Sequence, residues 1–102
     1  MTAMRYAICN ETFGDWPLAK ACEFAASCGY TGLEIAPFTL APLATDVSAA
    51  ARAEIRRTLA VHGLDCVGLH WLLAKTDGFH VTHPDRAVRD RTVSYLGDLA
   101  RL

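Results

Sequence analysis

The 102-residue sequence lacks several patterns that identify large functional classes. It has no block of lysine and arginine, and its formal net charge is −1, so no electrostatic footprint for nucleic acid is expected. It also has no run of about 18 apolar residues, the length needed to cross a bilayer. Because a signal-peptide pattern is absent as well, we expect a cytoplasmic protein without membrane partners.

The chain has four cysteines, and no two of them have the C-x-x-C spacing of a zinc knuckle or a thioredoxin-type motif. We expect the cysteines to be free thiols that pack as small buried hydrophobic residues. They are Cys9, Cys22, Cys28 and Cys66. Gly-rich phosphate loops, the G-x-S-x-G elbow and the Walker motif are also missing, which leaves nucleotide-binding and serine-hydrolase sites without support.

Hydrophobic residues, in contrast, are abundant. They make up 52% of the chain when tyrosine is included and glycine is not. The usual apolar share of roughly 45–50% is counted with glycine and without tyrosine, and on that count this chain exceeds it by a wider margin. The length predicts one domain over residues 1–102. Because small domains bury a smaller fraction of their surface than large ones, the excess predicts either a dense core or apolar surface that a partner covers.

A partial internal repeat is the most informative pattern. The tetrapeptide Gly-Leu-Glu-Ile at positions 32–35 recurs in altered form as Gly-Leu-His-Trp at positions 68–71. The spacing is that of one strand-plus-helix unit. Each copy places an ionisable side chain, Glu34 or His70, at the carboxyl end of an expected strand. Active sites of parallel α/β folds are built at those ends.

Hydrophobic periodicity and capping signals predict alternating strands and helices. Strands are expected at 4–9, 31–36 and 64–69. Helices are expected to begin near Pro17 and end before Gly29, to run from a cap at Asp46 or Ser48 to His62, and to span 84–102 behind a capping box at Thr82. This order predicts an α/β fold of three consecutive β/α units with parallel strands. The loops after the strands are the longer ones, as in folds whose function lies at that edge.

Strand alternation gives the two ionisable residues a common direction. It places Glu34 with Gly32 on one face, and His70 with Cys66 and Gly68 on the corresponding face of the third strand. Glu34 is a candidate general acid/base or an orienting carboxylate, or else a carboxylate paired with a neighbouring strand. His70 is a candidate metal ligand, substrate hydrogen-bonder or proton shuttle, or else a satisfied histidine at a strand end.

The aromatic and remaining histidine residues give weaker signals. Trp16 and Trp71 lie at or beside strand-to-helix loops, where they are candidates for contact with a sugar or for loop packing. His80 and His83 follow His70 at spacings that fit no standard ligand motif, so no metal ligand is assigned.

Three segments, 7–13, 29–35 and 63–71, resemble the opening of a xylose-isomerase-like TIM barrel. That superfamily includes sugar-phosphate isomerases and epimerases and an apurinic endonuclease type. The resemblance implies the N-terminal part of a (β/α)8 barrel that acts on a sugar or sugar phosphate through an enediolate. It implies a catalytic role for Glu34 and substrate contacts for His70, Trp16 and Trp71. The family's divalent metal (Mn, Mg, Co or Zn) is held mainly by later strands, so none is expected on this chain alone.

Length separates this chain from the family, because a full barrel takes about 250 residues. We therefore expect a fragment that is inactive alone, with apolar surface that faces a missing barrel half or another copy in a homo-oligomer. Two alternatives stay open: a self-associating β/α module and a small doubly wound α/β binding domain without catalysis.

Overall fold

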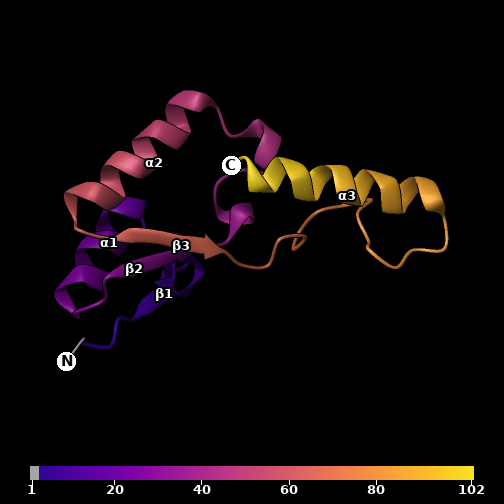
Figure 1. Ribbon diagram of the computed structural model, residues 1–102. Helices are drawn as coiled ribbons and strands as arrows, with labels where there is room; N and C mark the ends of the chain where they lie inside the picture. The colour runs from indigo at the N-terminus through magenta and orange to yellow at the C-terminus, as the bar shows by residue number, and fades with distance from the viewer. Residues whose placement is uncertain (1–2) are drawn as a thin grey trace.

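The computed structural model describes residues 3–102 and contains a parallel three-stranded sheet with helices (Figure 1). The strands, in the spatial order β1-β2-β3, are β1 (Ala7–Cys9), β2 (Gly32–Ile35) and β3 (Asp65–Leu69). The helices are α1 (Leu18–Ser27), α2 (Ala49–Val61) and α3 (Arg86–Ala100), with short 3-10 turns η1 (Asn10–Phe13), η2 (Pro37–Thr39) and η3 (Ala44–Asp46) in the loops. The α/β class and the parallel strand order predicted from the sequence are confirmed.

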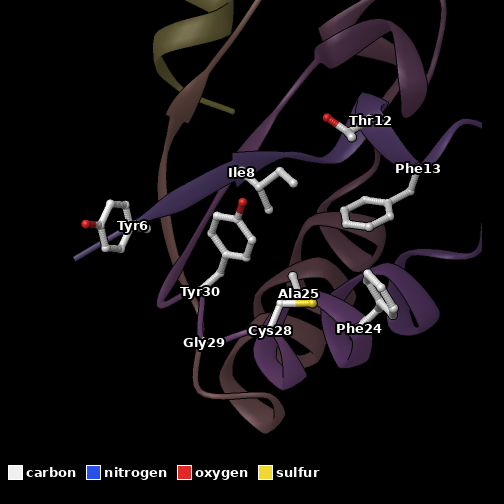
Figure 2. A pocket seen from close by; sticks show the side chains of 9 residues that line it. All are labelled: Tyr6, Ile8, Thr12, Phe13, Phe24, Ala25, Cys28, Gly29 and Tyr30. Carbon is white, nitrogen blue, oxygen red and sulfur yellow. The ribbon is translucent and has the colours of Figure 1, made fainter. Parts of the chain in front are cut away.

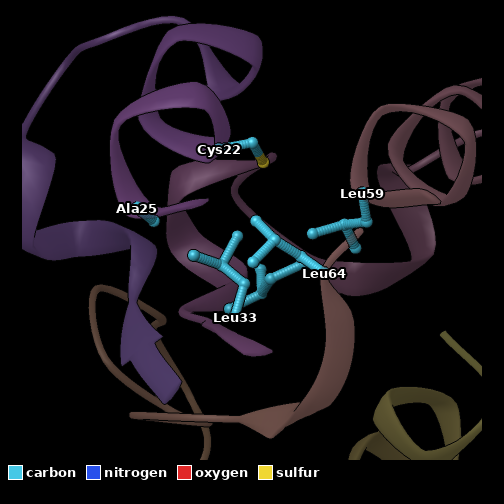
Figure 3. Packing of buried hydrophobic residues seen from close by; sticks show 6 residues of the cluster. Cys22, Ala25, Leu33, Leu59 and Leu64 are labelled. Carbon is cyan, nitrogen blue, oxygen red and sulfur yellow. The ribbon is translucent and has the colours of Figure 1, made fainter. Parts of the chain in front are cut away.

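One face of the sheet is covered by α1 and α2. Leu33 and Ile35 of β2 are buried on this face against Cys22 and Ala25 of α1 and Leu59 of α2 (Figure 3). Right-handed crossovers between strands in sequential order carry their helices to the same face. The opposite face of the sheet is therefore left uncovered by these two helices.

Side-chain caps fix the starts of α2 and α3, and the cap of α3 differs from the prediction. The Ser48 hydroxyl accepts a hydrogen bond from the Ala51 N–H at 3.1 Å and caps α2, as expected. In α3 the cap is Asp85, whose carboxylate accepts from the Ala87 N–H at 2.9 Å. The predicted start at residue 84 behind Thr82 is wrong, because aspartate is a strong N-cap and its carboxylate fixes the first turn two residues later.

A β-bulge interrupts the pairing of β2 with β3. Leu33 pairs with Cys66, but the next residue, Glu34, pairs with Gly68, so Val67 is an extra residue in β3. Such an insertion breaks the strict alternation of side chains along the strand.

The bulge changes which residues of β3 share a face. Cys66 and Leu69 both line a crevice beside α2, so both lie on the helix-covered face. The prediction that Cys66 shares a face with Gly68 and His70 is wrong, because it assumed uninterrupted alternation through Val67.

The cysteines are free thiols, as expected, but only some are buried. Cys22 is fully buried and Cys9 partly buried, whereas Cys28 and Cys66 are exposed. The expectation of burial is wrong for those two. Cys28 follows the last turn of α1, and Cys66 lies on an edge strand that α2 covers only in part.

Helix α3 lies beyond the carboxyl ends of the strands rather than on the sheet (Figure 1). Thr92, Tyr95 and Leu99 are buried on one side of the helix, and the Tyr95 hydroxyl accepts a hydrogen bond from the Ala44 N–H of η3 at 3.0 Å. The radius of gyration, 15.3 Å, exceeds the ~13 Å expected for a compact chain of this length because α3 reaches outward. At its carboxyl end the chain returns to α2: the Arg101 carbonyl accepts a hydrogen bond from the Arg52 guanidinium at 3.3 Å, and Leu102 lines the crevice between α2 and β3.

The position of Val67 in the bulge predicts that a side chain at Gly32 would destabilise the sheet. A Cβ at this position would lie 2.7 Å from Val67 Cγ1 and 3.1 Å from Ala7 Cβ. We expect Gly32→Ala to lower the free energy of unfolding by about 1–3 kcal/mol, as overpacking does, in urea titrations followed by circular dichroism. Adding Val67→Ala should restore most of the loss.

The matched control is Gly97→Ala on α3, where a Cβ meets only the Arg101 side chain at ordinary distance. This change should raise stability by about 0.5–1 kcal/mol, because alanine favours a helix interior. Equal effects at Gly32 and Gly97 would contradict the close approach of Val67 to β2.

Candidate functional site

The Glu34 carboxylate and the His70 imidazole meet at the carboxyl ends of β2 and β3. Glu34 Oε1 lies 3.8 Å from His70 Nδ1. The His70 N–H donates to the Ile35 carbonyl at 2.9 Å, which continues the strand pairing by one residue and fixes the position of the imidazole. The two side chains are 37% and 41% exposed, so both remain open to solvent. The structure thus brings together the two residues singled out by the internal repeat.

Strand β1 adds a thiol to this end of the sheet. Cys9 pairs in register with Glu34, and paired residues of parallel strands project to the same face. Burial raises the pKa of the Cys9 thiol above its usual value, a backbone hydrogen bond from Glu11 offsets part of the effect, and the Glu34 charge raises the pKa further. Cys9 is therefore a neutral thiol at neutral pH and a poor nucleophile.

Asn10, which directly follows β1, ties the strand ends together. Its side-chain oxygen accepts from the Ala36 N–H at 2.9 Å, and its amide nitrogen donates to the Thr39 hydroxyl at 2.8 Å. The loop after β2 is therefore held beside the end of β1. Sequence reasoning did not propose a role for Asn10, although it follows its strand much as His70 follows β3.

Trp71 belongs to a row of stacked rings next to the pair. Its indole stacks on the His70 ring with centroids 5.3 Å apart and on the Phe38 ring of η2 at 6.1 Å. We call His70, Trp71 and Phe38 the aromatic row. Trp71 is 55% exposed, so one surface of the row is accessible from solvent. Phe38 was missed by sequence reasoning because only the fold brings it beside Trp71.

Trp16 lies in a different aromatic cluster. Its ring packs on Phe13 and Phe24 with centroid distances of 5.5 and 5.9 Å, and the Lys20 ammonium lies 4.0 Å from its centroid. All four residues belong to the segment of η1 and α1. The structure therefore does not bring Trp16 into the aromatic row with Trp71.

The histidines of the third loop have structural contacts. Nδ1 of His80 accepts from the Thr82 N–H at 3.2 Å, and Nδ1 of His83 accepts from the Asp85 N–H at 3.0 Å. Across residues 3–102, no three histidine, cysteine, aspartate or glutamate side chains are grouped so that they could hold a metal ion. The donors described here therefore do not fit the divalent metal that the family resemblance implies.

The chain has no significant match to a protein-family model, a curated protein or a solved structure. In the part of the chain that the structure describes, no helix combines the length and apolar character of a membrane span.

The electrostatic effect of Glu34 on the pKa of its register partner Cys9 predicts a pH-dependent reactivity of the thiol. We expect Glu34→Gln to lower the pKa of Cys9 and to speed its alkylation by iodoacetamide a few-fold at mildly alkaline pH, because the neighbouring negative charge is removed. The measurement uses a Cys28→Ser/Cys66→Ser background and peptide mass mapping, and Cys22 stays protected by its burial.

Glu23→Gln on the exposed side of α1 is the control and should leave the alkylation profile unchanged. An unchanged profile in Glu34→Gln as well would show that the Glu34 charge does not act on the Cys9 thiol.

Proposed function

We propose that the chain forms the first three β/α units of a xylose-isomerase-like (β/α)8 barrel and contributes Glu34 and His70 to the pocket of a sugar or sugar-phosphate isomerase or epimerase. One observation carries the proposal: a carboxylate and an imidazole lie 3.8 Å apart at the carboxyl ends of adjacent parallel strands. Enzymes of the (β/α)8 type build their active sites at that edge.

The two faces of the sheet support the barrel assignment. The strands follow one another in sequence order, and α1 and α2 pack on one face. The other face carries small residues at Ala7 and Gly32, as expected where strands curve around a narrow barrel interior. A doubly wound domain would carry helices on both faces, so this arrangement favours the barrel over the small binding domain.

The spacing of the pair suits a ligand oxygen. At 3.8 Å the two groups are too far apart for a strong direct hydrogen bond, so neither is committed to the other. A hydroxyl oxygen about 2.8 Å from both atoms closes a triangle on this base, donating its proton to the Glu34 carboxylate and accepting a hydrogen bond from His70. One oxygen of a hydroxy-ketone therefore fits between Glu34 and His70.

Acid–base chemistry follows from this placement. The Glu34 carboxylate takes a proton from the carbon next to the ketone, and the electron pair of that C–H bond forms the carbon–carbon double bond of an enediolate. His70 donates a hydrogen bond to the oxygen on which negative charge develops. Return of the proton from Glu34 to the former carbonyl carbon, with the hydroxyl proton of the other carbon passing to the alkoxide oxygen, gives the isomer. Epimerisation needs a second acid on the opposite face of the enediolate, which another unit of the barrel would supply.

The steps above are those of this chain's own residues, and among residues 3–102 no three histidine, cysteine, aspartate or glutamate side chains are grouped to hold the family's divalent metal. In the barrel proposal that ion is bound by residues of other units. Turnover therefore requires those units, and the contribution of this chain alone is ligand binding.

Apolar surface on the described units supports completion by further units or by another copy. A crevice of about 490 Å³ opens beside β1 and α1 (Figure 2), and its lining includes Tyr6, Ile8, Phe13 and Tyr30. A second crevice, of about 210 Å³, lies between α2 and β3. Both flank edge strands, where an additional β/α unit or a second copy would pack.

The binding role is tested with fructose. Titration of the labelled chain should shift the backbone amide signals of Glu34 and His70 in NMR spectra, with millimolar affinity. Glu34→Gln should weaken binding by about fivefold, as expected for an exposed hydrogen-bonding group. His70→Ala should have a similar effect, and Glu23→Gln should have none. Shifts spread evenly over the surface, or unchanged affinity in both site variants, would refute the proposed pocket.

Self-association is tested by sedimentation velocity. We expect dimers or larger species whose fraction rises with concentration, because exposed apolar crevices are covered when copies meet. Tyr6→Lys at the larger crevice should shift the equilibrium toward monomer. Val61→Lys, at the exposed end of α2 outside both crevices, should not. A monomer at all concentrations would count against both the barrel fragment and the assembly module.

A further inference from the structure

Lys75 is a charged residue beside the aromatic row that the isomerase chemistry does not use. Its ammonium lies 4.6 Å from the centroid of the Phe38 ring. It takes part in none of the ion pairs found among residues 3–102. The positive charge is therefore held over an aromatic ring and remains available to an anion from solvent.

A chain of contacts through the aromatic row connects the Lys75 charge to Glu34 and His70. Contacts run from Glu34 to His70, from His70 to Trp71, from Trp71 to Phe38, and from Phe38 to Lys75. One end of the series carries a carboxylate and the other an ammonium, and the exposed indole lies between them. Ligand sites combine such aromatic surfaces with a few polar groups that fix orientation. An elongated ligand lying along the row meets a different charge at each end.

The backbone supports a functional reading of the same loop. Among residues 3–102, the non-glycine residues with positive φ are Trp71, at 56°, and Lys75, at 58°. This conformation is uncommon for residues with a side chain, and such outliers cluster at ligand sites. Turn hydrogen bonds, from the Ala74 N–H to the Trp71 carbonyl at 3.1 Å and from the Thr76 N–H to the Leu73 carbonyl at 3.2 Å, hold it in place.

We infer that Lys75 is a specificity-determining residue that selects polyol ligands with an anionic group, phosphate or carboxylate, at the end remote from Glu34. The inference rests on the proposed sugar-binding function and adds the charge of the ligand to it. Lysine binds such groups as a point charge, and its flexible stem adjusts to ligands of different length. The competing role for Lys75 is packing of the loop through Phe38 alone.

The test is an NMR titration of the full chain that follows the amide signals of His70 and Trp71. The probes are fructose, fructose 6-phosphate, gluconate and inorganic phosphate. We expect fructose 6-phosphate and gluconate to bind about fivefold more tightly than fructose, the gain typical of an exposed ion pair. Lys75→Met should remove this preference and leave fructose binding unchanged, whereas Lys75→Arg should retain it.

Lys20→Met is the matched control, because Lys20 also lies over an aromatic ring, that of Trp16. It should leave the preference intact. Fructose and fructose 6-phosphate binding equally would overturn the role of Lys75 but leave the sugar site standing. If inorganic phosphate shifted the His70 and Trp71 signals as much as fructose 6-phosphate does, the role of Lys75 in selecting polyol ligands would also be overturned, because the effect would be simple anion binding. No site-specific shift with any sugar would overturn both proposals.

Discussion

The extra residue in β3 decides where the candidate site lies. Cys66 faces the helices, so uninterrupted alternation from that point would send Leu69 away from them and His70 toward them. The insertion of Val67 reverses both directions, and Leu69 packs toward the core while His70 emerges beside Glu34. Gly68, with φ of +158°, supplies the backbone conformation at this point. The juxtaposition of Glu34 and His70 therefore depends on a local irregularity of the sheet.

The same irregularity links the site to the packing of the uncovered face. Val67 lies over Gly32, where a Cβ would be only 2.7 Å away, so the glycine at the start of β2 and the bulge in β3 require each other. Glu34, two residues further along β2, then pairs with Gly68 and has no bulky neighbour from β3 beside it. Small residues thus leave room on this face for a ligand at its carboxyl end.

Local patterns were sufficient to predict the strands, the helices and the meeting of Glu34 with His70, because each depends on residues close in sequence and on one rule of parallel sheets. The bulge was not predictable, since it arises from the pairing of two strands and leaves no distinct mark beyond a glycine. The aromatic row was missed for a similar reason. Phe38 and Trp71 lie in different loops, and only the fold places one against the other.

The contacts of α3 anchor the loop after β3, which carries His70 and Trp71 of the aromatic row. Tyr95 stacks on Phe79 with centroids 4.4 Å apart, and the Thr92 hydroxyl accepts a hydrogen bond from the His80 N–H at 2.8 Å. Both contacts fasten the end of the loop after β3 to the buried face of the helix. A further β/α unit that drew α3 into the crevice beside α2 would pull on this loop and move Trp71. In the barrel proposal, packing of a further unit against α3 would therefore change the position of Trp71 beside Glu34 and His70.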